Sequence, residues 1–252
     1  MRIGNTEEHT AIFPAKTYLP LLFPSPFLST VILTHEIDYT EHELIAPEVK
    51  TCYKIFKELF NSISGSELSN IERKKKNLVS SEFTYGEIEY PYFVALLKMV
   101  AKGTGGVFWD LGCGTGKPLI AAALGSHSFS KICGVELLEG LCNAAKKVVE
   151  EYIQKAIYNN IDTKERLESL FTVVQNDMLK VDWSDGDVIY AASICFPEEL
   201  LKALCEKGKL LKKGARIITL KNWEEPKYYK VLHCLRVKMT WGKNRIYILE
   251  RI

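Results

Sequence analysis

From residue 91 onward, the chain alternates between short apolar runs and stretches in which apolar residues recur with helical spacing. The short runs predict strands at 107–111, 131–136, 171–175, 187–192, 215–220, 235–240 and 245–252. Helices are predicted between them, at 91–102, 118–124, 141–156 and 197–208. Strands that alternate with helices are typical of a parallel α/β sheet, and the last two strands predict a closing antiparallel hairpin.

The first 79 residues follow a different pattern and are predicted to form an arm and a mainly helical extension. Residues 1–38 hold four of the nine prolines and show no helical period, which is typical of irregular chain. Apolar spacing predicts a helix over 45–59, which begins or breaks at Pro47, and then a Ser- and Gly-rich loop over 61–69. The main domain is expected over 80–252.

Three glycines spaced by two follow the first predicted strand. The sequence VFWDLGCGTG places Asp110 two residues before Gly112, and Gly114 and Gly116 follow. Glycine lets the chain turn sharply and lets a ligand lie against bare backbone, and the helix start that follows offers unpaired N–H groups. The motif therefore predicts a ligand site, with Asp110 facing the same ligand.

The spacing of these glycines separates three kinds of nucleotide-type ligand. A dinucleotide site uses GxGxxG, whereas this motif reads GxGxG. A P-loop needs GxxxxGK followed by Ser or Thr, but Lys117 is followed by Pro118, which has no hydroxyl for magnesium. DxGxGxG resembles motif I of the class I, seven-β-strand S-adenosylmethionine (SAM) methyltransferases. SAM is thus the expected cofactor, with a dinucleotide and a ligand-free turn as alternatives.

Acidic residues also stand at the ends of the second and third predicted strands, where open α/β sheets bind ligands. Glu136 is expected to accept both ribose hydroxyls, because a carboxylate offers lone pairs to two neighbouring donors; an exposed strand-end Glu is the alternative. Asp177 is expected to accept the adenine amino group. Met178 is expected to cover the adenine ring.

A polar and aromatic segment, Tyr85, Gly86 and Glu87, precedes the helix at 91–102. Two interpretations are open. In the first, the segment is a lid in which Tyr85 contacts the cofactor and Glu87 reaches the SAM ammonium group. In the second, it is a turn that leads into the helix.

Three segments together resemble the disruptor-of-telomeric-silencing family of non-SET histone lysine methyltransferases. They are YGE at 85–87, GVE at 134–136, and an SWxG-like hairpin with Trp241 and Gly242 that ends in Tyr247. The resemblance covers about two thirds of the chain. It implies a Rossmann-like seven-stranded methyltransferase sheet, SAM as cofactor, and a protein lysine as substrate, with a histone or nucleosome as the candidate partner.

The resemblance also suggests which residues contact the substrate lysine. The family's segment after strand four carries two amides and two aromatics, and here it reads Ala192, Ser193, Ile194, Cys195 and Phe196. Phe196, Trp241 and Tyr247 are expected to form aromatic walls of a lysine channel, with ordinary core positions as the alternative. Ser193 is expected to orient the amine, with a cap on the following helix as the alternative.

Charge and cysteine content limit the partners, metal sites and cellular location that we expect for the protein. A net charge of +2 argues against a protein that binds nucleic acid through a strongly charged tail. No sequence-specific nucleic-acid binding is therefore expected. The seven cysteines include no CxxC pair, and no histidine is spaced to complete a zinc site, so no metal is expected. An odd cysteine count and the lack of a signal peptide or long apolar span indicate an intracellular protein, in nucleus or cytoplasm.

We therefore expect a SAM-dependent methyltransferase that acts on a protein lysine. The altered segment after strand four leaves two alternatives open. One is a class I methyltransferase that acts on a non-histone protein or a small molecule. The other is a catalytically silent SAM-binding module.

Overall fold

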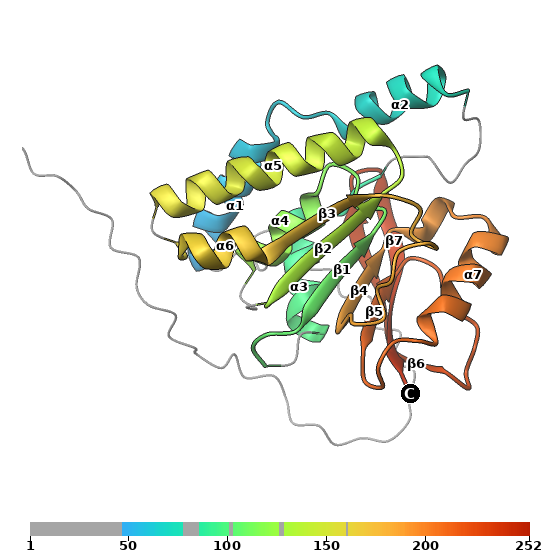
Figure 1. Ribbon diagram of the computed structural model, residues 1–252. Coiled ribbons are helices and arrows are strands. Elements are labelled where there is room, and N and C mark those ends of the chain that lie inside the picture. Colours follow the sequence, from blue (N-terminus) through green and yellow to red (C-terminus); the bar gives the residue numbers. More distant parts are fainter. Residues whose placement is uncertain (1–46, 78–85, 101–102, 126–128, 160) are drawn as a thin grey trace, which may run out of the picture.

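The protein contains a seven-stranded sheet with helices on both faces (Figure 1). The computed structural model describes residues 47–77, 86–100, 103–125, 129–159 and 161–252, so Tyr85 and the predicted arm lie outside the described residues. The strands are β1 (Val107–Leu111), β2 (Lys131–Glu136), β3 (Phe171–Gln175), β4 (Val188–Ala191), β5 (Arg216–Thr219), β6 (Tyr229–Met239) and β7 (Gly242–Arg251).

The strand order is β3-β2-β1-β4-β5-β7-β6. Strands β1 to β5 are mutually parallel where they pair, and β7 runs antiparallel to both β5 and β6. The predicted Rossmann-like methyltransferase sheet with its closing hairpin is confirmed. The carboxyl ends of five parallel strands thus meet at one edge, where ligands bind in open α/β sheets.

Two hydrophobic clusters form the core, one on each face of the sheet. The helices are α1 (Pro47–Phe60), α2 (Gly65–Lys75), α3 (Tyr90–Val100), α4 (Lys117–Leu124), α5 (Glu139–Tyr158), α6 (Lys164–Leu170) and α7 (Glu198–Gly208). Because side chains alternate along a strand, Phe108 of β1 packs in the larger cluster with α1 and α3 to α6, whereas Trp109 packs in the smaller one with α7. Residues of α1 therefore pack in the same hydrophobic core as one face of the sheet.

The predicted elements differ from the structure at several points. The stretch 61–69 was expected to be a loop, but α2 begins at Gly65, and Ser64 caps it by accepting the N–H of Glu67. Helix α6 lies in a stretch for which no helix was predicted, and Thr163 caps it. Strand β6 begins at Tyr229, ahead of the predicted 235.

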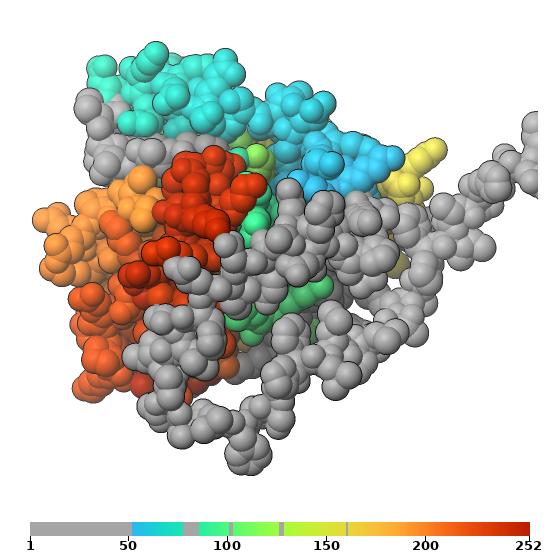
Figure 2. Space-filling model, turned by 180° about the vertical axis from the view of Figure 1, so that it is seen from behind, coloured from blue at the N-terminus to red at the C-terminus, as the bar shows by residue number. Residues whose placement is uncertain are grey.

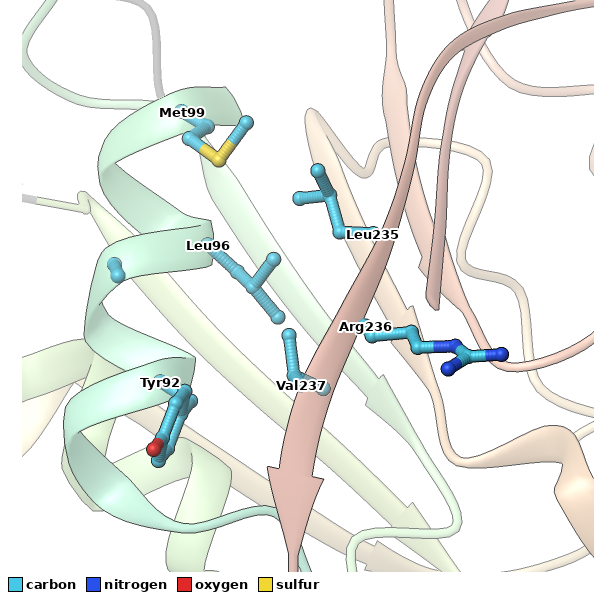
Figure 3. Close-up of a pocket in the computed structure, with 7 residues that line it drawn as sticks. Tyr92, Leu96, Met99, Leu235, Arg236 and Val237 are labelled. Carbon is cyan, nitrogen blue, oxygen red and sulfur yellow. The ribbon is translucent and has the colours of Figure 1, made fainter. Parts of the chain in front are cut away.

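Strand β6 lies against α3 on the outer side of the hairpin. Leu235 and Val237 face Tyr92, Leu96 and Met99 of α3 across a small apolar groove, while Arg236 points the other way (Figure 3). From behind, α2 (teal) lies above the red surface of the hairpin and α1 (blue) lies to its right (Figure 2). No helix in the described parts of the chain has the length and apolar character of a membrane span.

Candidate active site

The three glycines of the motif form a bare backbone turn after β1. Gly112, Gly114 and Gly116 all adopt left-handed conformations, with φ of 90°, 54° and 85°. The N–H groups of Gly112 and Cys113 donate to the carbonyl of Val135 at 2.8 and 3.0 Å, so the loop folds back over the end of β2. Because L side chains rarely adopt this conformation, the turn needs glycine on backbone grounds alone.

Glu136, the last residue of β2, connects this loop to the start of α5. One carboxylate oxygen accepts the N–H of Gly114 at 2.9 Å, and the other accepts the N–H of Leu138 at 2.8 Å. Burial raises the pKa of Glu136, although these backbone hydrogen bonds oppose the rise. A carboxylate has about four acceptor sites, so both oxygens retain lone pairs for hydroxyl donors.

Asp110 lies fully buried beneath the glycine loop. Within the described residues, neither of its carboxylate oxygens has a hydrogen-bond partner, and the same holds for the hydroxyl of Tyr190. The two residues are aligned in the register of β1 and β4, so their side chains stand on the same face. Burial, and then the charge of Glu136, raise the pKa of Asp110 well above its ordinary value. Buried polar groups without partners are costly, at about 1–3 kcal/mol each, so the pair favours a polar ligand.

The carboxylate of Glu87 lies at the start of α4. It forms an ion pair with Lys117 and is 3.4 Å from the hydroxyl of Thr115. The structure therefore brings Glu87 to the glycine loop, as the lid interpretation expects. It also shows that Lys117 competes with any ligand ammonium group for this carboxylate.

The YGE segment and the hairpin, 153 residues apart in sequence, are joined. The N–H of Thr240 donates to the carbonyl of Glu87 at 3.0 Å, and the N–H of Glu87 donates to the hydroxyl of Thr240 at 3.4 Å. The ring of Trp241 lies directly on Gly86, where an added Cβ would be 2.1 Å from a ring carbon. Two of the three segments that carry the family resemblance thus form one unit.

The third strand end also lies beside the glycine loop. The N–H of Asn176 donates to the carbonyl of Glu136 at 3.0 Å, and an added Cβ on Gly112 would be 3.6 Å from the terminal methyl of Met178. Asp177 is half-buried and accepts the N–H of Leu179 at 2.9 Å. Met178 and the glycine loop are thus close enough to contact a common ligand.

Ser193 ties together the ends of β4 and β5. Its hydroxyl oxygen lies 2.8 Å from the hydroxyl of Thr219 and accepts the N–H of Lys221 at 3.0 Å. The alternative of a cap on α7 was wrong, because Pro197 occupies the N-cap and no side chain caps this helix. The expectation that Ser193 orients the substrate amine stays a prediction.

The three predicted channel aromatics divide into two groups. Phe196 is buried in the smaller core cluster, and its carbonyl accepts the ammonium group of Lys221 at 2.5 Å. Tyr247 of β7 is half-buried and stands opposite Thr219. Trp241 lies with Gly86, and its side chain is exposed. The shared neighbours Thr219 and Lys221 therefore connect Phe196 and Tyr247 with Ser193, while Trp241 belongs to the YGE unit.

Replacing Ser193 by Ala should lower the free energy of unfolding by about 1–3 kcal/mol, because the change strands the N–H of Lys221 and the hydroxyl of Thr219 in a buried site. Urea unfolding measures this change. Ser169→Ala is the matched control, since Ser169 makes exposed hydrogen bonds within its own helix. Equal stability of the two variants would contradict the structural tie.

Comparison with known proteins identifies the family. A family model described as "Histone methylation protein DOT1" matches residues 68–238. The chain belongs to this family.

Curated relatives resemble the chain over about two thirds of its length. A protein of Dictyostelium discoideum named "Histone-lysine N-methyltransferase, H3 lysine-79 specific" is 24% identical over 172 residues, which are 67% of this chain and 9% of that protein. A protein of the same name from Cryptococcus neoformans is 29% identical over 156 residues, which are 60% of this chain and 23% of that protein. The chain thus covers less than a quarter of either relative.

A solved structure shares the fold. The structure, described as "a putative RNA methyltransferase" from Pyrococcus horikoshii, superimposes with a TM-score of 0.52 at 12% identity and covers 82% of this chain and 99% of that one. At this identity the likeness shows the fold alone. It agrees with the class I methyltransferase architecture of the sheet.

SAM is the cofactor of the DOT1 family, and the residues at this site fit it. SAM presents an ammonium group and a ribose diol, both of which are hydrogen-bond donors. The unpartnered carboxylate of Asp110 and the remaining lone pairs of Glu136 are acceptors on either side of a turn in which Gly112, Gly114 and Gly116 carry no side chain. The acceptors of Asp110 and Glu136 therefore match the donor groups of SAM in charge and in hydrogen-bonding capacity.

The sequence pattern does not reveal several residues of this DOT1-family site. Tyr190 reads as a core residue in a strand, and only the register with β1 places it beside Asp110. Thr219 and Lys221 stand at a strand end that carries no acid. The P-loop pattern presents Lys117 only as a phosphate ligand, although its position directly after the glycine motif is a signal that it lies at the site.

Proposed function

We propose that the chain transfers a methyl group from SAM to a lysine side chain of histone H3. The observation that carries the proposal is the pair of buried carboxylates, Asp110 and Glu136, beside a left-handed glycine loop in a DOT1-family chain. The substrate comes from the relatives, both of which are named as specific for lysine 79 of H3. A histone substrate would place the protein with chromatin.

In this proposal the chain acts mainly by positioning. When bound, SAM supplies an electrophilic methyl group on its sulfonium. Glu136 accepts the ribose hydroxyls, and Asp110 and Glu87 attract the ammonium end, which fixes the direction from which a nucleophile can approach. The lysine must arrive neutral, and a desolvated channel favours its neutral form.

At the far strand ends, we propose that Asp177 and Met178 hold the adenine. Met178 is supported by its approach to Gly112, and Asp177 by its place at the same strand end. For the lysine channel we propose Phe196, Tyr247 and Trp241 as walls. The exposed ring of Trp241, held on the lid segment, supports a role in admitting substrate.

Replacing Gly86 by Ala should lower the methyl-transfer rate by about 10-fold, because the new methyl group displaces the ring of Trp241 from the lid segment. Stability should change little, since the ring is 42% exposed and can swing into solvent. Single-turnover methyl transfer and thermal unfolding measure the two effects. Trp241→Ala should reproduce the loss.

Tyr158→Ala is the control for this pair, because it removes another exposed aromatic, on α5, and should leave the rate unchanged. A Gly86→Ala variant as fast as the native chain would contradict a role for the Trp241 position in transfer.

The proposed reaction is tested by transfer of labelled methyl from SAM to nucleosomes and, in parallel, to a fractionated cell extract, with Gly114→Val as the blank. Label on a histone H3 lysine would support the proposal. Label only on another protein or a small molecule would retain the transferase and replace the substrate. SAM binding without transfer to any target would indicate a silent SAM-binding module.

A further inference from the structure

Glu72 of α2 reaches across to the first turn of α5. Its carboxylate accepts the N–H of Glu139 at 2.8 Å and the N–H of Gly140 at 2.6 Å. The same carboxylate is 2.6 Å from the ammonium group of Lys76, one turn further along α2. Glu72 is 7% exposed, so an acidic side chain is buried between two helices.

Helix α5 depends on this outside acceptor. The first N–H groups of a helix have no partner within it, and a side chain at the N-cap usually accepts one of them. The N-cap of α5 is Leu138, whose side chain offers no acceptor. Glu72 therefore supplies the missing cap from another helix. Gly140 makes room for it, because an added Cβ there would lie 2.9 Å from a carboxylate oxygen of Glu72.

The capped turn is continuous with Glu136. The N–H groups of three successive residues are divided between two carboxylates: Leu138 donates to Glu136, and Glu139 and Gly140 donate to Glu72. The second oxygen of Glu136 holds Gly114 of the glycine loop. A shift of the α5 terminus would therefore move the partner of Glu136 directly and the glycine loop through it.

The charge state of Glu72 suits this task. Burial alone would raise its pKa, but Lys76 and the N–H groups of Gly140 and Glu139 bring the pKa below its ordinary value. The carboxylate is therefore ionised at neutral pH, and a negative charge at a helix N-terminus is favourable.

We propose that Glu72 is a positioning residue of the cofactor site, which caps α5 from the N-terminal helices and thereby fixes Glu136 and the glycine loop for SAM. The inference rests on the proposed function in assuming that SAM binds there. It assigns to α2 a part in cofactor binding, although none of the residues predicted to bind SAM lies on that helix.

The decisive variants are Glu72→Ala and Gly140→Ala, each tested for SAM affinity by calorimetry and for stability by thermal unfolding. Glu72→Ala should raise the Kd for SAM by about 10-fold, within the range that loss of a helix cap can produce. Gly140→Ala should also raise the Kd, because the methyl group displaces the carboxylate of Glu72. Its melting temperature should fall less than that of Glu72→Ala, since the gain of alanine over glycine in a helix offsets part of the lost cap.

A purely structural role for Glu72 also predicts a lower melting temperature in Glu72→Ala, but it predicts an unchanged Kd in both variants, and an unchanged Kd would overturn the inference. Glu58→Ala is the matched control. It removes an exposed ion pair, 3.1 Å long, between α1 and Lys155 near the far end of α5, and it should leave the Kd unchanged.

Hydrogen exchange separates this inference from the proposed function. The amides of Glu139 and Gly140 should exchange faster in Glu72→Ala, with or without SAM, because their acceptor is gone. Unchanged exchange would overturn the cap itself. A native chain that binds no SAM would overturn the proposed function and the cofactor role of Glu72, whereas native affinity that neither variant alters would overturn the inference alone.

Discussion

Replacing Gly114 by Val is expected to raise the Kd for SAM by about 100-fold or more, which corresponds to about 2.7 kcal/mol or more of lost binding energy. Gly114 stands at φ of 54°, and its N–H donates to Glu136. A β-branched residue is strained in this conformation, and its side chain would occupy the turn against which we propose that the cofactor lies. Calorimetric titration with SAM measures the loss.

Backbone strain alone must be separated from loss of the ligand surface. Gly103→Val is the matched control, because Gly103 has φ of 66° and no heavy atom within 4 Å of an added Cβ. We expect it to lose stability from the same strain while keeping its SAM affinity. Equal losses of affinity in both variants, or native affinity in Gly114→Val, would contradict the placement of the cofactor on this turn.

The central sheet could be predicted because each parallel strand is a short apolar run that ends in a recognisable turn. The glycine motif after β1 and the acid at the end of β2 mark the carboxyl edge of the sheet as a ligand site through residue type and spacing alone. These signals are local. They need only the residues of one strand and the turn that follows.

Helix α2 escaped prediction because its buried face is not apolar. The residues that it buries are Gly65, Ser69 and Glu72, and its first residues resemble a Ser- and Gly-rich loop. Ser64 and Gly65 are in fact its N-cap and first residue. The helix is held by polar contacts to α5, which no periodicity of apolar residues reveals.

The start of β6 was missed for a different reason. Its apolar alternation is interrupted by a register shift between Val231 and His233, so the period of two is visible only from Leu235 onward. Edge strands also tend to carry charged residues, such as Lys230 here, which make the strand harder to recognise in the sequence.

The contacts that complete the site join residues far apart in sequence. The hairpin carries Trp241 onto Gly86, and the register of β1 with β4 sets Tyr190 beside Asp110. Tyr190 reads as an ordinary core residue in sequence, and nothing local places Trp241 on Gly86. Both contacts depend on the order of the strands in the sheet, which no local pattern of residues reveals.

Replacing Glu136 by Ala should weaken SAM binding by about 1–3 kcal/mol, the cost of leaving hydrogen-bond donors without their charged acceptor. Part of that cost falls on the chain itself, since the N–H groups of Gly114 and Leu138 also lose their acceptor. Glu139→Ala is the control, because it removes an exposed carboxylate three residues further on. Native affinity in Glu136→Ala would show that the ribose is held elsewhere.

The same carboxylate predicts a pH dependence of SAM binding. Burial raises the pKa of Glu136, so it takes up a proton at a higher pH than a free glutamate and then becomes a weaker acceptor. SAM affinity should therefore fall as the pH drops through this raised pKa. The folded state takes up this proton more readily than the unfolded state, so protonation of Glu136 does not itself unfold the chain. The part of the pH dependence that disappears in Glu136→Gln belongs to Glu136. A Glu136→Gln variant with the full native pH profile would contradict this assignment.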